Sequence, residues 1–394
     1  MNGWHVGLIG GGIVVWLWIR RATHLRQRSP RRLVPRYGPV ALEVQRRKNA
    51  ATQARGAGII RYTNSRRTLG MLVVTGGAGF IGSALVAALN ARGRGDILVV
   101  DDFGDGPKWK NLRGKRFLDV VAPDTFARDL AAGAYQGKIE GILHIGAVTD
   151  TSYPDMDEFY VRNVRYTRTL AQWALANQAR FVYASSASVY GDGALGFSDT
   201  DEVTPTLLPL NPYAFSKWLS DTEAIRDGWT EKAVSLRFFN VFGPNEYHKG
   251  RMASVVWHSA NQIRETGQIN LFQSHKEGYA DGEQERDFVY VKDVCAVVLW
   301  FLDHPEANGI YNVGTGQART FNDLAAAIFR ALDKTPQIAY IPTPENIRAA
   351  YQYHTEADLT RLHGVGCDVP FLSLEEAVRD YVGNYLQNET DPYL

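Results

Sequence analysis

Tyr213 and Lys217 are the residues whose types and spacing most directly suggest chemistry. They follow Asn211 at the start of a predicted helix, and residues four apart lie on one helical face. An ammonium beside a phenol favours the phenolate, so we expect Lys217 to lower the pKa of Tyr213 from about 10 toward neutral pH. Tyr213 would then act as a general base or acid at a substrate hydroxyl. The alternative is an exposed pair on an amphipathic helix.

A predicted strand from Arg180 ends in a cluster of serines about 25 residues before this helix. Ser186 in that cluster could hold the oxygen atom of the substrate, and Lys217 could also reach the ribose of a nicotinamide cofactor. These roles require a dinucleotide site elsewhere in the chain.

The elements that must position these residues begin at a glycine-rich turn in residues 71–82. The sequence Met-Leu-Val-Val-Thr-Gly-Gly-Ala-Gly-Phe-Ile-Gly predicts a buried strand, a tight turn and a helix. Gly76, Gly79 and Gly82 suit the turn, a close approach of phosphate and close packing of helix on sheet. The helix N-terminus at Phe80 would direct amide groups at a pyrophosphate.

A second predicted strand, residues 96–100, ends in two acids where a dinucleotide ribose is recognised. An acid there, Asp101 or Asp102, favours NAD, whereas Lys108 in the next loop could pair with the 2′-phosphate of NADP. The alternatives are turn capping for the acids and a solvated surface charge for Lys108.

A third predicted strand, residues 141–146, leads into small residues where the sheet would face a cofactor. His144 inside it is interpreted as a core histidine. Asn163 is expected to begin a helix that runs through Trp173.

Strands and helices alternate through the rest of the chain, which predicts an α/β fold with a doubly wound parallel sheet, the Rossmann arrangement. We expect a cofactor domain in residues 71–240. Residues 241–394 would form mainly a smaller substrate-binding domain, with elements that return to the sheet. The later predicted elements are strands 309–313 and 338–341 and helices 291–302, 321–332 and 374–386.

The chain has 394 residues and a net charge of +1, but its charges are unevenly distributed. Residues 1–70 contain 14 Lys or Arg and one acid, so residues 71–394 carry a net charge of −12. An acidic body argues against nucleic acid as a ligand. The two cysteines, Cys295 and Cys367, have neither metal nor redox spacing, which suits the reducing cytoplasm. No metal site is predicted.

The first 70 residues form a basic extension with an apolar run at residues 6–19. That run is short of the roughly 20 residues of a membrane span, and the Arg-rich and Pro-rich sequence after it suggests disorder. The extension could be a membrane anchor, a targeting segment or sequence read from too early a start codon. We favour the last reading, since Met71 heads the first strand. Contact of the basic tail with acidic lipid is a further alternative.

The glycine turn, the strand-end serines and Tyr213 with Lys217 resemble the extended short-chain dehydrogenase/reductase superfamily from Met71 to the C-terminus. In branches that dehydrate nucleotide sugars, an Asp-Glu pair follows the strand-end serine or threonine. Here Ala187 and Ser188 occupy that place, which counts against a dehydratase.

Residues 248–255, His-Lys-Gly-Arg-Met-Ala-Ser-Val, resemble the ADP-glyceromanno-heptose 6-epimerase family more specifically. That family inverts C6 of ADP-D-glycero-D-manno-heptose for the inner core of lipopolysaccharide, using a tightly held NADP. The resemblance implies proton-transfer groups on two sides of a transient carbonyl, Tyr213 and Lys249. The alternative for Lys249 is a counter-charge to a phosphate or a carboxylate. Further matching segments are residues 101–108, 271–274, 286–291, 308–315 and 351–359.

The residues and the resemblance together give two sets of predicted contacts. The cofactor, NADP or alternatively NAD, would contact Gly76, Gly79, Phe80, Ile81, Gly82, Asp101, Asp102, Lys108, Ile145, Gly146, Ala147, Val148, Thr149, Asn163, Lys217, Val241 and Lys249. The nucleotide sugar would contact Ser186, Asn240, Arg251, His258, Phe272, Gln273, Ser274, His275, Arg286 and Tyr351. Arg286 should pair with the pyrophosphate of the substrate, or alternatively form an interdomain salt bridge.

The sequence departs from the family in three places: the basic extension of residues 1–70 has no counterpart there, and two departures lie in the catalytic body. Arg251 stands where a small hydroxyl residue is expected, and residues 275–285 lengthen the loop before Arg286. Another nucleotide-sugar epimerase or reductase, such as one acting at C4, is the alternative enzyme. A non-catalytic dinucleotide-binding protein would be expected to have lost Tyr213, Lys217 or Lys249. The family implies a cytoplasmic homo-oligomer, with a pentamer as one size, and no membrane partner for the catalytic body.

Overall fold

The computed structural model describes residues 70–394 except 152, 349–350 and 389. These residues belong to one compact unit. The basic extension and its apolar run at residues 6–19 lie outside the described residues. Within the described part of the chain, no helix is both long and apolar enough to cross a membrane.

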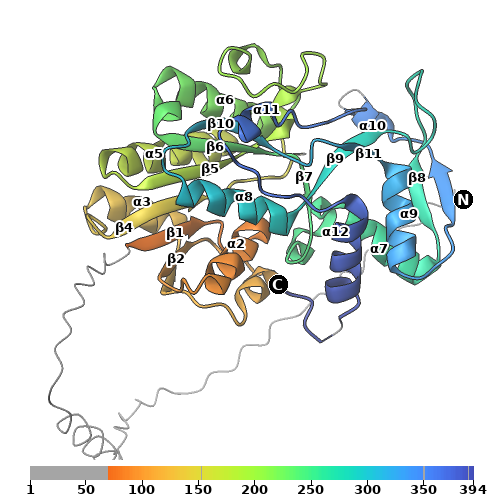
Figure 1. The fold of residues 1–394 in the computed structure, drawn as a ribbon, viewed down its shortest axis with the longest axis horizontal. Helices are drawn as coiled ribbons and strands as arrows, with labels where there is room; N and C mark the ends of the chain where they lie inside the picture. The colour runs from red at the N-terminus through yellow and green to blue at the C-terminus, as the bar shows by residue number, and fades with distance from the viewer. Residues whose placement is uncertain (1–69, 152, 349–350, 389) are drawn as a thin grey trace, which may run out of the picture. The chain divides into compact units, whose positions relative to one another are not determined.

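Seven parallel strands form the central sheet in the order β10-β6-β5-β4-β1-β2-β3 (Figure 1). The order reverses between β1 and β4, and ligands bind at such a point in doubly wound sheets. The predicted Rossmann sheet is therefore confirmed, including the return of the chain at β10. The strands are β1 Met71–Thr75, β2 Ile97–Val100, β3 Asp119–Val121, β4 Ile139–His144, β5 Arg180–Ser186, β6 Ala233–Phe238 and β10 Gly309–Val313.

Helices cover both faces of this sheet because successive side chains of a strand point to opposite faces. In β1, Leu72 and Val74 join the core cluster that contains α2 and α8, while Val73 joins the cluster that contains α3 and α5. Figure 1 shows α2 and α8 side by side on one face. The helices are α2 Phe80–Ala91, α3 Pro123–Ala131, α5 Tyr166–Ala176, α6 Pro212–Arg226 and α8 Val291–Asp303.

The helix that was expected to begin at Asn163 begins earlier. Asp155 caps α4 (Met156–Phe159) by accepting from the amides of Asp157 and Glu158. The chain then continues through a π-helical segment, η2 (Tyr160–Arg165), into α5. Asn163 consequently lies in a π turn, a feature often found at functional sites.

The second half of the chain adds two small sheets beside the main one. Their orders are β11-β9-β7 and β12-β8, and the predicted later helices are present with small shifts at their ends. The division into domains at residue 240 stays a prediction. The elements are β7 Asn240–Phe242, η6 Tyr247–Met252, α7 Val255–Thr266, β8 Ile269–Phe272, β9 Glu285–Tyr290, β11 Ala318–Thr320, α9 Phe321–Ala331, β12 Ile338–Ile341, α10 Glu345–Arg348, α11 Thr360–Gly364, α12 Leu374–Asp380 and η7 Tyr381–Leu386.

Candidate active site

Three cavities of about 290, 260 and 380 Å³ follow one another along the carboxyl edge of the central sheet. The first two share Gly76, Asp101 and Lys108, and the last two share Phe80 and Lys249 among their lining residues. A channel through three adjoining cavities suits an elongated ligand such as a dinucleotide. We call the 380 Å³ cavity the reaction cavity, because the predicted catalytic residues line it.

The glycine turn in the middle of the channel has little space for side chains. Gly76 has φ +64°, and a Cβ atom there would lie 2.6 Å from the Cα of Gly146. A Cβ on Gly82 would collide with the carbonyl oxygen of Gly76, so α2 can start close to the sheet only with glycine here. No side chain caps the N-terminus of α2 at Gly79. The first-turn amide groups of α2 are thus open to an anion, and this cradle fits a dinucleotide pyrophosphate.

At the end of the channel away from the reaction cavity, Asp101 both caps the glycine turn and binds Lys108. Its carboxylate accepts from the amide of Ala78 at 2.9 Å and contacts the Lys108 ammonium at 2.5 Å. Lys108 also donates to the carbonyl of Asp102, which is exposed. The acid that would favour NAD is therefore partly neutralised by the lysine that would favour NADP, and Arg162 lines the same cavity.

Asn163 acts through the backbone of the loop after β4. Its side chain accepts from the amide of Val148 at 2.8 Å, and donates to the Val148 carbonyl and to Ser216 of α6 at 3.0 Å each. Asn163 thereby links the loop after β4, which lines the channel, to α6, which carries Tyr213 and Lys217. His144 is buried between Thr75 and Thr167, and burial lowers its pKa to about 3, as expected of a core histidine.

The structure brings Tyr213, Lys217 and Ser186 together in the reaction cavity. Asn211 caps α6 by accepting from the amide of Ala214. The buried Lys217 ammonium donates to the carbonyl of Ala184 at 2.8 Å, and burial lowers its pKa to about 8.

The expected fall in the pKa of Tyr213 is wrong. Burial raises the pKa of Tyr213 above 10, and its hydrogen bond with Ser186 only partly opposes this effect. Lys217 gives its hydrogen bond to the backbone instead. Tyr213 therefore remains a phenol that can donate a proton.

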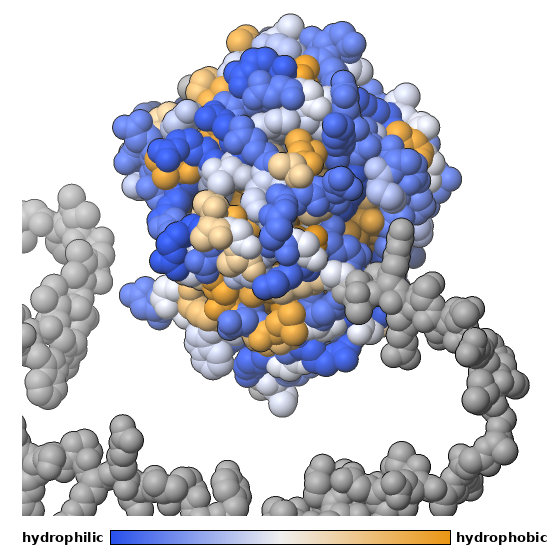
Figure 2. Space-filling model, turned by 90° about the vertical axis from the view of Figure 1, so that its left-hand side faces the viewer, coloured by the Kyte–Doolittle hydropathy of each residue, from blue (hydrophilic) through white to orange (hydrophobic). Residues whose placement is uncertain are grey.

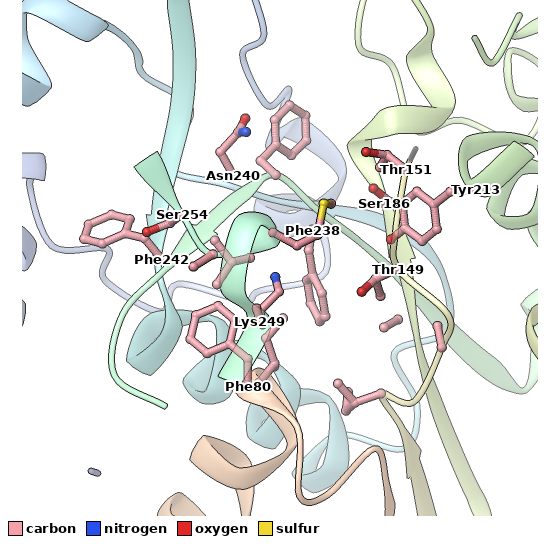
Figure 3. Close-up of a pocket in the computed structure, with 18 of the residues that line it drawn as sticks. Phe80, Thr149, Thr151, Ser186, Tyr213, Phe238, Asn240, Phe242, Lys249 and Ser254 are labelled. Atoms are coloured by element: carbon pink, nitrogen blue, oxygen red, sulfur yellow. The ribbon is translucent and has the colours of Figure 1, made fainter. Parts of the chain in front are cut away.

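Lys249 approaches the same cavity from η6, while Tyr213 approaches from α6 (Figure 3). Its ammonium lies 5.4 Å from the centroid of the Phe80 ring. Burial lowers the pKa of Lys249, an effect that the nearby Glu246 carboxylate partly opposes. Gly250, directly after Lys249, has φ +53° and allows the chain to turn.

The predicted substrate residues fall into two groups. Ser186 and Asn240 line the reaction cavity, and Figure 3 shows both. Phe272 and His275 make ring contacts with Tyr351 at 6.3 and 6.0 Å. Tyr351 and His275 line another hollow of about 510 Å³. Gln273 and Ser274 join Phe272 to His275 along the chain. Their backbone amides donate to the carbonyl of Ile341 and to the carboxylate of Asp281, respectively.

Arg286 belongs to the second group, with its guanidinium 5.4 Å from the Tyr351 ring centroid. It is 8% exposed, and no ion pair with an acid occurs among the described residues. The alternative of a salt bridge is thus not seen in the described part of the chain. The guanidinium donates to the carbonyl of Glu285 at 2.7 Å, but it lacks an anionic partner in the described part of the chain, and a phosphate would supply one.

Arg251 and His258 lie outside these groups, contrary to expectation. The Arg251 side chain is 66% exposed and pairs with Asp150 at 2.5 Å. His258 is exposed on α7, where its ring packs against Trp257. Neither residue lines the channel or the 510 Å³ hollow.

Sequence reasoning missed several residues of the channel. Thr151, Phe238 and Met252 line the reaction cavity, and their closeness in sequence to predicted site residues was the available signal. His248 lines the pyrophosphate part of the channel, and burial lowers its pKa to about 4, so it is neutral at pH 7.

A doubly wound sheet with a Tyr-x-x-x-Lys pair beside a glycine-rich dinucleotide channel defines an enzyme of the extended short-chain dehydrogenase/reductase class. The model of the NAD dependent epimerase/dehydratase family matches residues 72–314, and the chain belongs to that family. A nicotinamide dinucleotide is accordingly its cofactor.

The chain is also similar to individual proteins along most of its length. It is 48% identical over 324 residues to ADP-L-glycero-D-manno-heptose-6-epimerase of Nitratidesulfovibrio vulgaris (strain DP4), covering 82% of this chain and 100% of the relative. It is 44% identical over 333 residues to the protein of that name from Fusobacterium nucleatum, with coverage of 82% and 100%. The crystal structure of the Helicobacter pylori protein of that name matches with a TM-score of 0.67 and 29% identity over 80% of this chain and 96% of the other.

Proposed function

We propose that this enzyme converts ADP-D-glycero-D-manno-heptose to ADP-L-glycero-D-manno-heptose, supplying heptose for the inner core of lipopolysaccharide. The observation that carries the proposal is the approach of Tyr213 and Lys249 to one cavity from two different elements, next to the dinucleotide channel. Similarity to enzymes of that name over their whole length supports the same substrate.

Bound NADP would accept a hydride from C6 of the sugar and return it to the opposite face of the resulting carbonyl. The residues of this chain then need to move one proton at each stage, from the C6 hydroxyl and back to the C6 oxygen. Inversion turns the other face of C6 toward the cofactor, so the C6 oxygen meets a different proton-transfer group. Tyr213 and Lys249 provide these two groups, while Ser186 orients the oxygen.

The same burial prepares the two groups for opposite tasks. Removal from water disfavours the charged form of any group, so it raises the pKa of Tyr213 and lowers that of Lys249. Burial therefore favours a neutral phenol, which can donate a proton, and a neutral amine, which can accept one. An acid and a base in one cavity are what oxidation followed by reduction at one carbon requires.

The preference for NADP is part of this proposal. Lys108 and Arg162 supply positive charge to the channel end where Asp101 would bind a ribose. A 2′-phosphate would draw Lys108 away from Asp101. The nucleotide released on denaturing the purified protein, identified by mass spectrometry, distinguishes the two cofactors.

The nucleotide part of the substrate is proposed to lie near Arg286 and Tyr351, whose cationic and aromatic side chains suit a pyrophosphate and an adenine ring.

We also propose a cytoplasmic homo-oligomer, with a pentamer as one possibility. Hydrophobic residues form patches among hydrophilic ones on the face shown in Figure 2. Val161 of η2 and Phe215 of α6 are among the exposed hydrophobic side chains, at 43% and 39% exposure. Light scattering after size-exclusion chromatography would give the number of subunits.

Product analysis tests the proposed function. Purified enzyme incubated with ADP-D-glycero-D-manno-heptose should give a mixture of both C6 configurations by NMR. An unchanged C6 configuration after long incubation would rule the activity out, and inversion at C4 of another nucleotide sugar would favour the alternative enzyme.

A further inference from the structure

Residues Asp391 to Leu394 lie against the part of the chain that follows η1 (Pro107–Leu112) on the cofactor side. Arg113 pairs with Asp391 at 2.9 Å, and its guanidinium carbon lies 4.8 Å from the Tyr393 ring centroid. Lys115 donates to the backbone oxygen of Leu394. The segment is thus fixed next to the polar loop that lines the channel.

The same segment contacts the loop that carries Lys249. The hydroxyl of Tyr247 donates to the carbonyl of Pro392 at 2.6 Å. The Tyr247 ring also meets the Tyr393 ring edge to face, with centroids 5.4 Å apart. This contact lies two residues before Lys249, at the beginning of η6.

Asn245 is the residue where this segment, the loop and the cofactor helix meet. Asn245 is fully buried with φ +78°, a left-handed conformation that surrounding contacts must hold. Its side chain donates to the Ser83 hydroxyl of α2 and accepts from the amide of Leu394, at 2.9 Å each. Its carbonyl accepts from Asn111 at 3.1 Å. The turn before Lys249 is therefore held by partners from three distant parts of the chain.

The backbone of this loop determines where the Lys249 ammonium lies. Within the described part of the chain, the ammonium has no hydrogen-bond partner, and it lies 5.4 Å from the centroid of the Phe80 ring. The Lys249 amide donates to the carbonyl of Glu246 at 2.9 Å. A shift of the turn at Asn245 would consequently move the amine within the reaction cavity.

We propose that residues 391–394 position Lys249 for the reaction through Asn245 and Tyr247, although none of the four lines the reaction cavity. The inference rests on the proposed role of Lys249. A misplacement of about 1 Å at a reacting group can cost roughly 10²-fold in rate. Asn245 bonds Ser83 of α2, and Asn111 links Asn245 to the carbonyl of Ala78 in the glycine turn. The effect should still fall mainly on kcat, because the amides of Gly76, Ala78 and Gly79 have their own partners in Val100, Asp101 and Gly76.

Two variants test the proposal in the full-length enzyme with its cofactor bound. Asn245→Gly keeps the left-handed backbone and removes both side-chain hydrogen bonds, since glycine adopts positive φ freely. Deletion of residues 391–394 removes the segment itself. The control is Asn384→Ala in η7, which removes an exposed hydrogen bond to Asp380 at the end of α12.

Both variants should lower kcat by about 10-fold to 100-fold, with the retained nucleotide unchanged. In the plot of kcat against pH, the limb that reports the titration of Lys249 is the one that should be lost in Lys249→Met. In both test variants this limb should move to higher pH, because a less confined amine is better hydrated and its pKa rises. Hydrogen exchange of amides 245–250 should speed up in both variants and stay unchanged in the control.

The exchange measurement needs no substrate, so it tests the positioning role even if the wild-type enzyme leaves the heptose unchanged and the proposed function fails. Wild-type exchange of amides 245–250 in both variants would overturn the inference. A lower kcat with an unmoved pH limb would also overturn it, because that result indicates general damage to the fold.

Discussion

The two sides of the reaction cavity are built differently. Tyr213 and Lys217 lie on α6, a 15-residue helix whose hydrogen bonds are internal. Lys249 lies on η6, a short turn whose shape depends on Asn245 and on residues 391–394. A regular helix fixes the spacing of its side chains by itself, whereas a turn requires contacts from elsewhere. The helix side should therefore tolerate distant changes that disturb the loop side.

The helix side has its own buried support one turn after Lys217. Asp221 and Arg237 form an ion pair at 2.9 Å with both side chains 0% exposed. Tyr183, Ser185 and Ser235 also donate to the Asp221 carboxylate. This network joins α6 to β5 and β6 and keeps the helix in register with the serine cluster.

The largest expected effect comes from breaking that network. Asp221→Ala leaves the buried Arg237 charge without its carboxylate, so the free energy of unfolding should fall by about 3–5 kcal/mol. Urea denaturation measures the change. Asp227→Ala, which removes the exposed partner of Arg226, is the matched control and should leave the free energy of unfolding nearly unchanged, because water screens an exposed pair. Equal effects of the two variants would contradict the role given to the buried pair.

Tyr213→Phe tests the chemistry of the helix side without disturbing its packing. Loss of the phenolic proton should reduce kcat by about 10²-fold or more, while the nucleotide stays bound. Steady-state kinetics and the nucleotide content of the protein measure the two quantities. The exposed Tyr153→Phe should behave as wild type. A near-normal kcat in Tyr213→Phe would remove the phenol from the mechanism.

The buried amine of Lys217 gives a pH-dependent prediction. Its pKa of about 8 lies below the usual 10.5, so the unfolded chain binds more protons between these values and folding stability rises with pH there. Relative to Lys217→Met, the wild type should gain about 2 kcal/mol in the free energy of unfolding between pH 7 and pH 9.5. Parallel urea titrations of both proteins would show this gain. If the difference in the free energy of unfolding between the two proteins did not change with pH, the pKa of Lys217 would not be lowered in the folded enzyme.

Arg251 provides the smallest effect, on the loop side. Its exposed pair with Asp150 should contribute at most about 1 kcal/mol, and the residue lines none of the site cavities. Arg251→Ser should therefore leave kcat within about fivefold of wild type, the change in rate that about 1 kcal/mol would give. A larger loss in kinetic assays would show that the loop reaches the substrate through this residue.

The same contrast explains how much the sequence could predict. The glycine turn and the Tyr213–Lys217 pair are local patterns, so the sheet and the helix side were predictable from spacing. The raised pKa of Tyr213 was not, because it depends on burial by residues far away in sequence. The turn at Asn245 depends on Leu394, 149 residues later, and no local pattern signals that contact. Arg251 shows the converse, since a motif position alone did not place its side chain in the site.

The two-sided mechanism is tested most directly by Lys249→Met, with the exposed Lys138→Met as control. Both proteins should retain the nucleotide, and the control should invert C6 of ADP-D-glycero-D-manno-heptose at the wild-type rate by NMR. Lys249→Met should do so about 10²-fold more slowly or worse. Inversion by Lys249→Met at the wild-type rate would contradict the account.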